Sequence, residues 1–324
     1  MKKLIFKSAL LLITVGTLLH MGGSAYKHTT NYLNLERTEQ TDVFQHMPDQ
    51  IDIAVFGASH GREDFKTAPE GAVMFNFALS SQRPVYDLRL MRQYQKHIRP
   101  GALVVLTVSP MYPFYLEQEE FFNKLQPRYY RILYPWNMID PDWGYALRLR
   151  FSPLLTEDFT KVASAFLRPE ELVPTWDERS AGKQLQPEDL PAEKERIHKD
   201  HISPDFIAFP NEGPAMADAY REMLALCQER GWNAVLVTPP YTAEYCECFE
   251  EYSADYFSVL ERFMDGLTEK YGVPWFDFSR DPTFSSRYDL FKDIDHMNQE
   301  GAALFNEKFW ALVRSQGLIP QLHR

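Results

Sequence analysis

Hydrophobic and polar positions along the chain alternate between two patterns, one typical of buried strands and one typical of amphipathic helices. Mostly apolar runs predict strands at residues 51–56, 73–77, 102–110, 233–241 and 273–278. Apolar residues at helical spacing predict helices around residues 85–98, 217–227 and 256–267, and a last helix after residue 298. Asn298 is suited to cap that last helix because its side chain can accept a backbone N–H bond. Strands that alternate with helices predict an α/β fold with a mostly parallel sheet.

The middle of the chain departs from this alternation. Residues 111–166 are rich in aromatic side chains, and residues 168–205 are charged and contain several prolines. We interpret both stretches as one long insertion, at about residues 111–208, after the third strand. The aromatic residues between Tyr112 and Trp143 are expected either to form the core of this insertion or to form a lid or a face against a membrane partner, since exposed aromatics favour interfaces. The main domain is then expected to cover residues 51–324.

The N-terminus carries a positive leader followed by an apolar segment. Lys2, Lys3 and Lys7 precede the apolar run, and the small residues Gly23 and Ala25 follow it. Residues 1–25 therefore predict either a cleaved signal peptide or an uncleaved anchor, because roughly 18 apolar residues can just span a bilayer. Either interpretation exports the chain from residue 26 onward and keeps the lysines inside. Residues 26–50 are expected to be a linker from the membrane.

Composition and cysteine content exclude some classes of protein. The 324 residues carry a formal net charge of −11, and no block of lysine or arginine occurs after the first seven residues. Nucleic acid is therefore not an expected partner, because phosphate binding needs a basic surface. Cys246 and Cys248 form a pair with one intervening residue, Cys227 stands alone, and no histidine lies near enough for a zinc motif. Free thiols are expected, with a disulfide from Cys227 to one of the pair as the alternative.

Three polar segments follow predicted strands and are expected to meet at one edge of the sheet, where ligand sites of open α/β sheets lie. They are Gly57-Ala58-Ser59 after the first strand, residues 75–82 after the second, and residues 293–301 after the last. A serine nucleophile needs a base within hydrogen-bond reach and a group that orients that base. We predict Ser59 as the nucleophile, His296 as the base and Asp293 as the orienting carboxylate.

Other titratable residues are weaker candidates for the same chemistry. Asp295 competes with Asp293, but the spacing to His296 favours Asp293. His60 is adjacent to Ser59, a poor position for its base, so a structural or substrate-facing role is expected. His198 and His201 fall in the polar part of the insertion and are expected on the solvated surface, as charged, proline-containing segments usually are.

The segments quoted above resemble the SGNH/GDSL hydrolase superfamily. Gly57 and Ser59 match the first block, which normally reads Gly-Asp-Ser, and Asp293-Ile294-Asp295-His296 matches the last block, Asp-x-x-His. Together with "FNFALSSQ" and "HIRPGALVVLTVSP", they resemble an exported, membrane-anchored branch associated with membrane-bound O-acyltransferases. The alginate O-acetylation proteins and the D-alanyl transfer protein of teichoic acid are broad relatives. The resemblance covers roughly residues 50–110 and 210–316, and it implies a three-layer, flavodoxin-like sandwich with a parallel five-stranded sheet.

The chain departs from the family pattern at the groups that would bind an oxyanion. Ala58 replaces the aspartate of the first block, Ser80-Ser81-Gln82 lacks the second-block glycine, and Val108-Ser109-Pro110 lacks the third-block asparagine. The candidate donors are the backbone N–H of Ser59, a backbone N–H near Ser81 and the side-chain amide of Gln82. Asn76 and His60 complete the set of oxyanion or substrate-binding candidates, although Asn76 is better suited to bracing the structure.

The resemblance implies an exported serine esterase or O-acyltransferase, with acetyl as the expected acyl group and a cell-surface polysaccharide or other polymer as substrate. It requires no metal and no organic cofactor, and a membrane-bound O-acyltransferase is an expected partner. The alternative is a non-catalytic protein that binds polymer or serves as a scaffold for such an acyltransferase. The missing third-block asparagine is the feature that favours this alternative.

Overall fold

The computed structural model describes residues 1–116, 119–175 and 182–319, with side chains described outside residues 117–125. The chain divides into two compact units. Unit 1 consists of Met1–His46 and Asn123–Arg179, and unit 2 of Met47–Phe122 and Ser180–Arg324. The segment predicted as a single insertion at about residues 111–208 is therefore shared between the two units.

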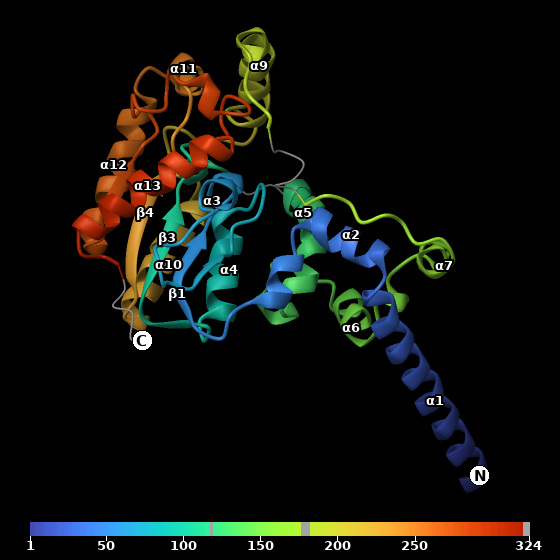
Figure 1. The fold of residues 1–324 in the computed structure, drawn as a ribbon. Coiled ribbons are helices and arrows are strands. Elements are labelled where there is room, and N and C mark those ends of the chain that lie inside the picture. Colours follow the sequence, from blue (N-terminus) through green and yellow to red (C-terminus); the bar gives the residue numbers. More distant parts are fainter. Residues whose placement is uncertain (117–118, 176–181, 320–324) are drawn as a thin grey trace. The chain divides into compact units, whose positions relative to one another are not determined.

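Unit 2 is built on a parallel sheet of five strands in the order β2-β1-β3-β4-β5 (Figure 1). The strands are β1 (Ile51–Phe56), β2 (Met74–Asn76), β3 (Ile98–Thr107), β4 (Asn233–Thr238) and β5 (Trp275–Asp277). This order is the flavodoxin-like one, so the predicted fold class is confirmed. The third strand begins earlier than predicted, because Ile98 already pairs with Ile51 of β1.

Helices cover both faces of this sheet (Figure 1). The helices of unit 2, not all of which lie on the sheet, are α3 (Ser59–Asp64), α4 (Pro84–Tyr94), α9 (Leu190–Asp200), α10 (Pro214–Arg230), α11 (Ala243–Tyr252), α12 (Tyr256–Tyr271) and α13 (Gln299–Ser315). Connections between parallel strands are right-handed. The step from β1 to β2 runs opposite to the later steps, so α3 lies on the face opposite α4, α10 and α12. Helix α13 joins α3, where the ring of Phe65 packs edge-on against Phe305 and Phe309.

Short turns of 3-10 helix complete the regular structure of the described residues. They are η1 (Asp42–His46), η2 (Tyr112–Phe114), η3 (Pro135–Asn137), η4 (Pro153–Leu155), η5 (Pro187–Asp189) and η6 (Tyr288–Leu290). The predicted cap is confirmed: Asn298 Oδ1 accepts a hydrogen bond from the Gly301 N–H at 3.0 Å. The three cysteines are buried free thiols, so the alternative of a disulfide from Cys227 was wrong.

Unit 1 contains the N-terminal segment together with most of the first half of the insertion. Its helices are α1 (Lys2–Lys27), α2 (Thr30–Glu39), α6 (Trp143–Phe151), α7 (Phe159–Leu167) and most of α5 (Glu119–Ile132). Tyr26 and Tyr32 are buried together with Ala165 in a small core. The segment predicted as a linker, residues 26–50, thus contains α2 and η1.

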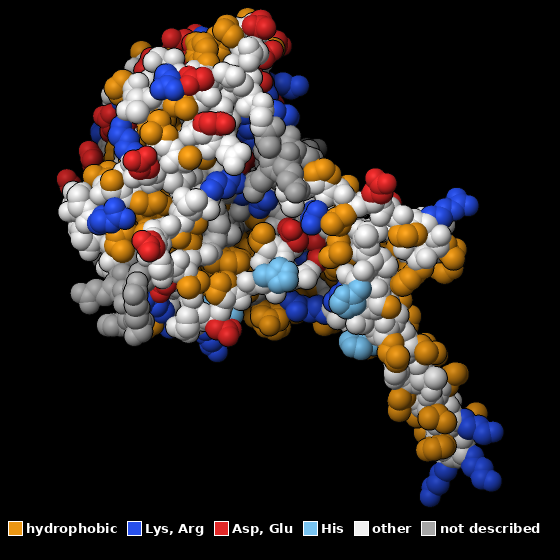
Figure 2. Space-filling model, in the orientation of Figure 1, with side chains coloured by type: hydrophobic (Ala, Val, Ile, Leu, Met, Phe, Trp, Pro, Cys, Tyr) orange, Lys and Arg blue, Asp and Glu red, His pale blue; other side chains and the backbone are white. Residues whose placement is uncertain are grey.

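Helix α1 is long and apolar enough to cross a membrane, and no other helix in the described part of the chain meets that test. Its apolar side chains are exposed along most of its length, as Figure 2 shows, with the three lysines of the leader at its free end. A signal sequence has the same properties. The structure therefore supports a membrane anchor or a signal segment, as the sequence predicted.

The turn after β1 is the part of the fold that places Ser59. Gly57 has φ = +139°, and a Cβ atom there would lie 1.7 Å from Thr107 Oγ1 on the neighbouring strand β3. The buried carboxylate of Asp87 on α4 accepts the Gly57 N–H at 2.8 Å. Only glycine fits this sharp turn without displacing β3, so the turn is fixed from both sides of the backbone.

We expect Gly57→Ala to destabilise unit 2 by about 3 kcal/mol, since it combines a strained φ with overpacking against Thr107. The effect is to be measured as a loss of unfolding free energy in urea, with the full chain in detergent. Gly266→Ala in α12 is the matched control, because a Cβ there meets no atom within 4 Å. It should be neutral or slightly stabilising. Equal effects of the two substitutions would contradict the tight fit at Gly57.

Candidate active site

Ser59 lies at the carboxyl end of β1, as the first residue of α3 after the N-cap Ala58. Its side chain reaches across to the loop before α13: Ser59 Oγ is 2.8 Å from His296 Nε2. The two residues are 237 positions apart in sequence. The parallel sheet therefore joins two of the three segments that the sequence predicted to meet at this edge.

The third predicted residue, Asp293, holds the other nitrogen of the imidazole. Asp293 Oδ1 is 3.0 Å from His296 Nδ1, and the same oxygen accepts the backbone N–H of His296 at 2.7 Å. Thr242 supports this loop by donating its hydroxyl to Ile294 O at 2.8 Å. An Nδ1–H that donates to Asp293 leaves Nε2 free to accept the Ser59 hydroxyl proton. Ser59, His296 and Asp293 therefore have the geometry of a catalytic triad.

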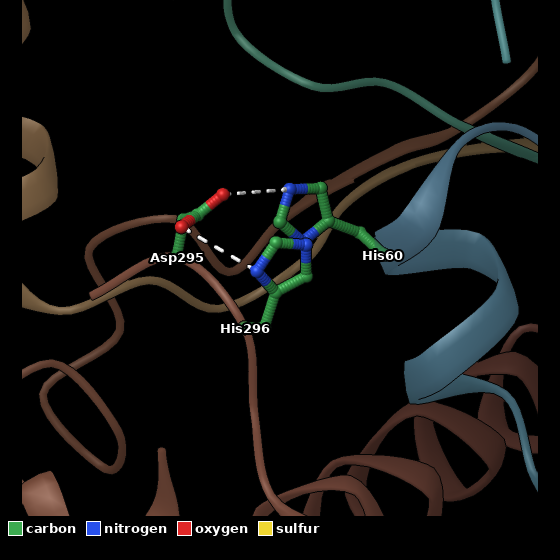
Figure 3. A group of neighbouring side chains, drawn as sticks. All are labelled: His60, Asp295 and His296. Atoms are coloured by element: carbon green, nitrogen blue, oxygen red, sulfur yellow. Dashed lines mark ion pairs between the residues drawn. The ribbon is translucent and has the colours of Figure 1, made fainter. Parts of the chain in front are cut away.

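A second carboxylate, Asp295, lies beside His296 and is 1% exposed. Its Oδ1 is 3.4 Å from His296 Nδ1, and its Oδ2 is 3.8 Å from His60 Nε2, so it faces both imidazoles (Figure 3). The guanidinium of Arg196 on α9 also pairs with Asp295 Oδ1. The sequence ranked Asp293 above Asp295, and the distances agree, but Asp295 is the more deeply buried of the two charges on His296.

His60 is packed beneath His296 and does not face a substrate. It is 2% exposed, and its ring stacks on that of His296 with centroids 4.6 Å apart. The ring of Tyr241 packs edge-on against His60, with ring centroids 5.0 Å apart. The substrate-facing role allowed for His60 was therefore wrong, and the structural role is the one that its burial supports.

Burial and charge favour different protonation states for the two stacked histidines, His296 and His60. Burial alone would lower the pKa of His296, but the carboxylates of Asp293 and Asp295 outweigh it and raise this pKa well above 6.5. Burial, followed by the charge on His296, holds the pKa of His60 well below 6.5. Burial would raise the pKa of Asp295, yet His296 and Arg196 are among the charges that hold it well below 3.8. An imidazolium at His296 above a neutral His60 is the arrangement these shifts favour.

The structure places the side chains predicted to bind an oxyanion or substrate in different environments. The side-chain amide of Gln82 is fully buried and donates to Phe77 O at 3.1 Å and to Asp87 Oδ1 at 2.6 Å, so the prediction of Gln82 as an oxyanion donor was wrong. Asn76 Nδ2 donates to Gly61 O at 2.8 Å, which makes Asn76 a brace of the loop. Ser81 is exposed with φ = +56°. The backbone N–H groups of Ser59 and near Ser81 stay predictions.

His201 departs from the sequence-based expectation, whereas His198 does not. His198 is exposed and pairs with Glu251 at 3.1 Å. His201 is partly buried, with Nδ1 3.4 Å from the hydroxyl of Tyr245, and burial lowers its pKa to about 4. The polar composition of the segment did not indicate this burial, because it arises from a contact distant in sequence: Tyr115 donates its hydroxyl to His201 O at 3.1 Å.

Sequence reasoning also missed two residues that support the site, Asp87 and Arg196. Asp87 lies on the buried side of α4, and Arg196 occurs in a charged segment that reads as solvated surface. Neither has a motif of its own. In sequence, Asp87 and Arg196 cannot be distinguished from aspartates and arginines on the solvent side of a helix, so no signal identified them as part of the site.

The donor atoms around Asp295 could approach a metal ion, since His60, Asp295 and His296 present ligand atoms within 4.8 Å of one another. The charges argue against a resident metal there. Arg196 already neutralises Asp295, and His296 is shared between Ser59 and Asp293. A cation at this position would have to displace the guanidinium and would uncouple the serine from its base.

We expect the imidazole of His296 to remain protonated above pH 6.5, because two carboxylates face it. Asp295→Asn should lower this pKa, since it removes one of the two charges. The measurement is ¹H–¹⁵N NMR of histidine-labelled protein in detergent, with His296→Gln to assign the signal. Asp289→Asn is the control, as its exposed carboxylate pairs with Arg287 instead. A His296 that titrates at or below 6.5 in the unaltered protein would contradict this electrostatic picture.

No family model matches the chain, and no curated protein matches its sequence. The arrangement of Ser59, His296 and Asp293 is therefore the observation on which any function for this chain depends.

Proposed function

We propose that the chain is a serine O-acyltransferase or esterase that works through an acyl-serine intermediate. The single observation that carries the proposal is the continuous hydrogen-bonded path from Ser59 Oγ to His296 Nε2, at 2.8 Å, and from His296 Nδ1 to Asp293, at 3.0 Å. The path links the residue after strand β1 to the loop before α13, so a nucleophile, a base and a carboxylate that orients the base lie within reach of one another. The resemblance to the SGNH/GDSL superfamily supports the same assignment.

The proposed reaction has two acyl transfers. In the first, Ser59 Oγ attacks the carbonyl carbon of an acyl donor while its proton moves to His296 Nε2. The carbon–leaving-group bond then breaks, and the leaving group takes that proton. In the second transfer, His296 removes a proton from the acceptor hydroxyl, which attacks the acyl-serine and restores the Ser59 hydroxyl. Water as acceptor gives hydrolysis, and a hydroxyl of a polymer gives transfer.

Asp293 and Asp295 contribute differently to the proposed steps. Asp293 orients the ring, since it bonds both the backbone N–H and the Nδ1 of His296. Asp295 stabilises the imidazolium that forms when Ser59 loses its proton, and it is kept charged by Arg196. Because the resting imidazole is already stabilised as the cation, the fraction of active, neutral His296 should increase with pH.

The substrate and location follow from the resemblance together with the N-terminal helix. We infer that α1 is retained as an anchor, because its last turns pack into unit 1: Ser152 donates its hydroxyl to Leu19 O at 2.7 Å, and Tyr26 is 4% exposed. Cleavage after residue 25 would remove the Leu19 contact and would make the buried Tyr26 the new N-terminus. The leader lysines on the inner side then place the α/β unit outside the membrane. A cell-surface polysaccharide or polymer is the proposed acceptor, with a membrane-bound O-acyltransferase as the proposed source of acyl groups.

Incubation with an activated acetyl ester should add one acetyl group to the chain at Ser59. Ser59→Ala should abolish this labelling and lower ester turnover by about 10³-fold or more, since it removes the nucleophile. The readouts are intact-protein mass spectrometry and release of the chromophoric alcohol. Ser286→Ala, at an exposed serine, is the control and should behave as the unaltered chain. Equal labelling of Ser59→Ala would contradict the assignment and favour the scaffold alternative.

The pH dependence of ester turnover tests the role of Asp295. We expect kcat/KM to rise with pH through the raised pKa of His296, because only the neutral imidazole accepts the serine proton. Asp295→Asn should shift this rise to lower pH, since the cationic form loses a stabilising charge. The pH profile of both proteins, measured with the same ester, gives the result. If Asp295→Asn leaves the pH dependence of kcat/KM unchanged, Asp295 does not influence the protonation of His296.

A further inference from the structure

Unit 1 contains a cavity of about 420 Å³ where the chain leaves α1 and enters α2. It is lined by Ser24, Lys27, His28, Tyr32, Leu33, Glu36, Gln45, Tyr130, Arg131, Leu149 and Arg150. All of these residues belong to unit 1. The cavity is therefore separate from the Ser59 site, and the proposed acyl transfer does not use it.

The lining of this cavity is positively charged. Lys27, Arg131 and Arg150 contribute three cations against the single carboxylate of Glu36. Burial raises the pKa of Glu36, and the nearby charge of Arg131 opposes this shift. A cavity with this excess of positive charge attracts an anion.

Arg131 is the residue that most directly points to a ligand. Its side chain is 8% exposed, and Nη2 lies 3.5 Å from Glu157 Oε1. The guanidinium lies over the Tyr32 ring, 5.2 Å from its centroid, while Nε and Nη1 are buried with no hydrogen-bond acceptor among the described residues. Buried guanidinium donors are costly to leave unpaired. An anion in the cavity would supply the missing acceptors, and a guanidinium fork matches phosphate oxygens well.

The cavity lies at the depth of lipid headgroups when α1 spans a bilayer. The apolar run ends at Met21, and Lys27 follows roughly 9 Å further along the helix axis. The end of α6 runs beside the last turns of that run: a Cβ at Gly16 would lie 3.6 Å from the Phe151 ring, and His20 Nδ1 is 3.0 Å from Phe151 O. Phe151 is thus placed at the membrane by its contact with α1.

Exposed apolar side chains continue from α1 onto the neighbouring helices of unit 1, as Figure 2 shows. Large examples on α6 and α7 are Trp143, Leu147, Phe151, Phe159, Phe166 and Leu167, which are 46–82% exposed. Aromatic and aliphatic side chains of this kind are typical of the membrane interface. They support a unit 1 that rests on the bilayer surface, with the cationic cavity within reach of headgroups.

We propose that this cavity binds the phosphate group of an anionic membrane lipid at the outer face of the bilayer. Arg131 donates to the phosphate oxygens through Nε and Nη1, and Lys27 and Arg150 provide the surrounding positive charge. The acyl chains of the lipid lie along α1 and the exposed side chains of α6. Free inorganic phosphate has the same recognition chemistry, but the position beside a membrane span favours the lipid.

Native mass spectrometry of the full chain, released from detergent with added lipid, tests this proposal. The unaltered protein should retain one phosphatidylglycerol in preference to phosphatidylcholine. Lys27→Gln should weaken retention about tenfold, as expected for the loss of one charge-assisted contact. Arg131→Gln should weaken it at least as much. Lys27 is exposed, so its variant tests the site even where Arg131→Gln fails to fold.

Lys161→Gln on α7 is the matched control, because it removes an exposed positive charge of unit 1 outside the cavity lining. It should retain phosphatidylglycerol as the unaltered protein does. Equal retention of the two lipids by the unaltered protein, or an equal loss in Lys161→Gln, would overturn the proposal. Displacement of the lipid by an equal concentration of inorganic phosphate would overturn the assignment to a lipid. Ester turnover at Ser59 is independent of all these outcomes.

Discussion

The close approach of β1 to β3 at Gly57 is the constraint on which the candidate site depends. A backbone with φ = +139° and no side chain lets the chain turn beside Thr107 within a packed sheet. Asp87 then fixes the turn through the Gly57 N–H and also receives the amide of Gln82. Ser59 follows Gly57 by two positions, so the turn holds it at the end of the strand. From there it reaches His296, which is 237 positions away in sequence.

Charge around His296 is the second organising feature. The Asp293 carboxylate, whose side chain is 27% exposed, orients the ring. The Asp295 carboxylate, which is 1% exposed, lies 3.4 Å from the same ring nitrogen. Removing the buried carboxylate from water is unfavourable unless it is paired. The pairing comes from Arg196 on one side and from His296 on the other. The arrangement stabilises an imidazolium and so favours the proton-accepting step of the proposed reaction, while it reduces the neutral fraction of the base at low pH.

Unit 1 gives the first part of the chain a structure of its own. Residues of α1, α2 and α7 bury Tyr26, Tyr32 and Ala165 together, so helix α1 continues into a folded unit. The apolar faces of α6 and α7 and the cationic cavity lie in this same unit. If the acyl donor is a membrane protein or a membrane lipid, a unit that rests on the bilayer would keep the chain close to it. The Ser59 site and the lipid cavity are therefore complementary proposals that stand or fall separately.

The sequence by itself determined the α/β class, the order of five strands along the chain and the candidate triad. Apolar periodicity depends on local burial, and the Gly-x-Ser and Asp-x-x-His patterns occur at strand ends that parallel pairing must bring together. Tertiary structure alone decided what surrounds the triad. Gln82 turned inward to Asp87, His60 was buried beneath His296, and Arg196 reached Asp295 across 99 positions. Such pairings depend on which charged side chains lose their water, and a linear pattern does not specify that.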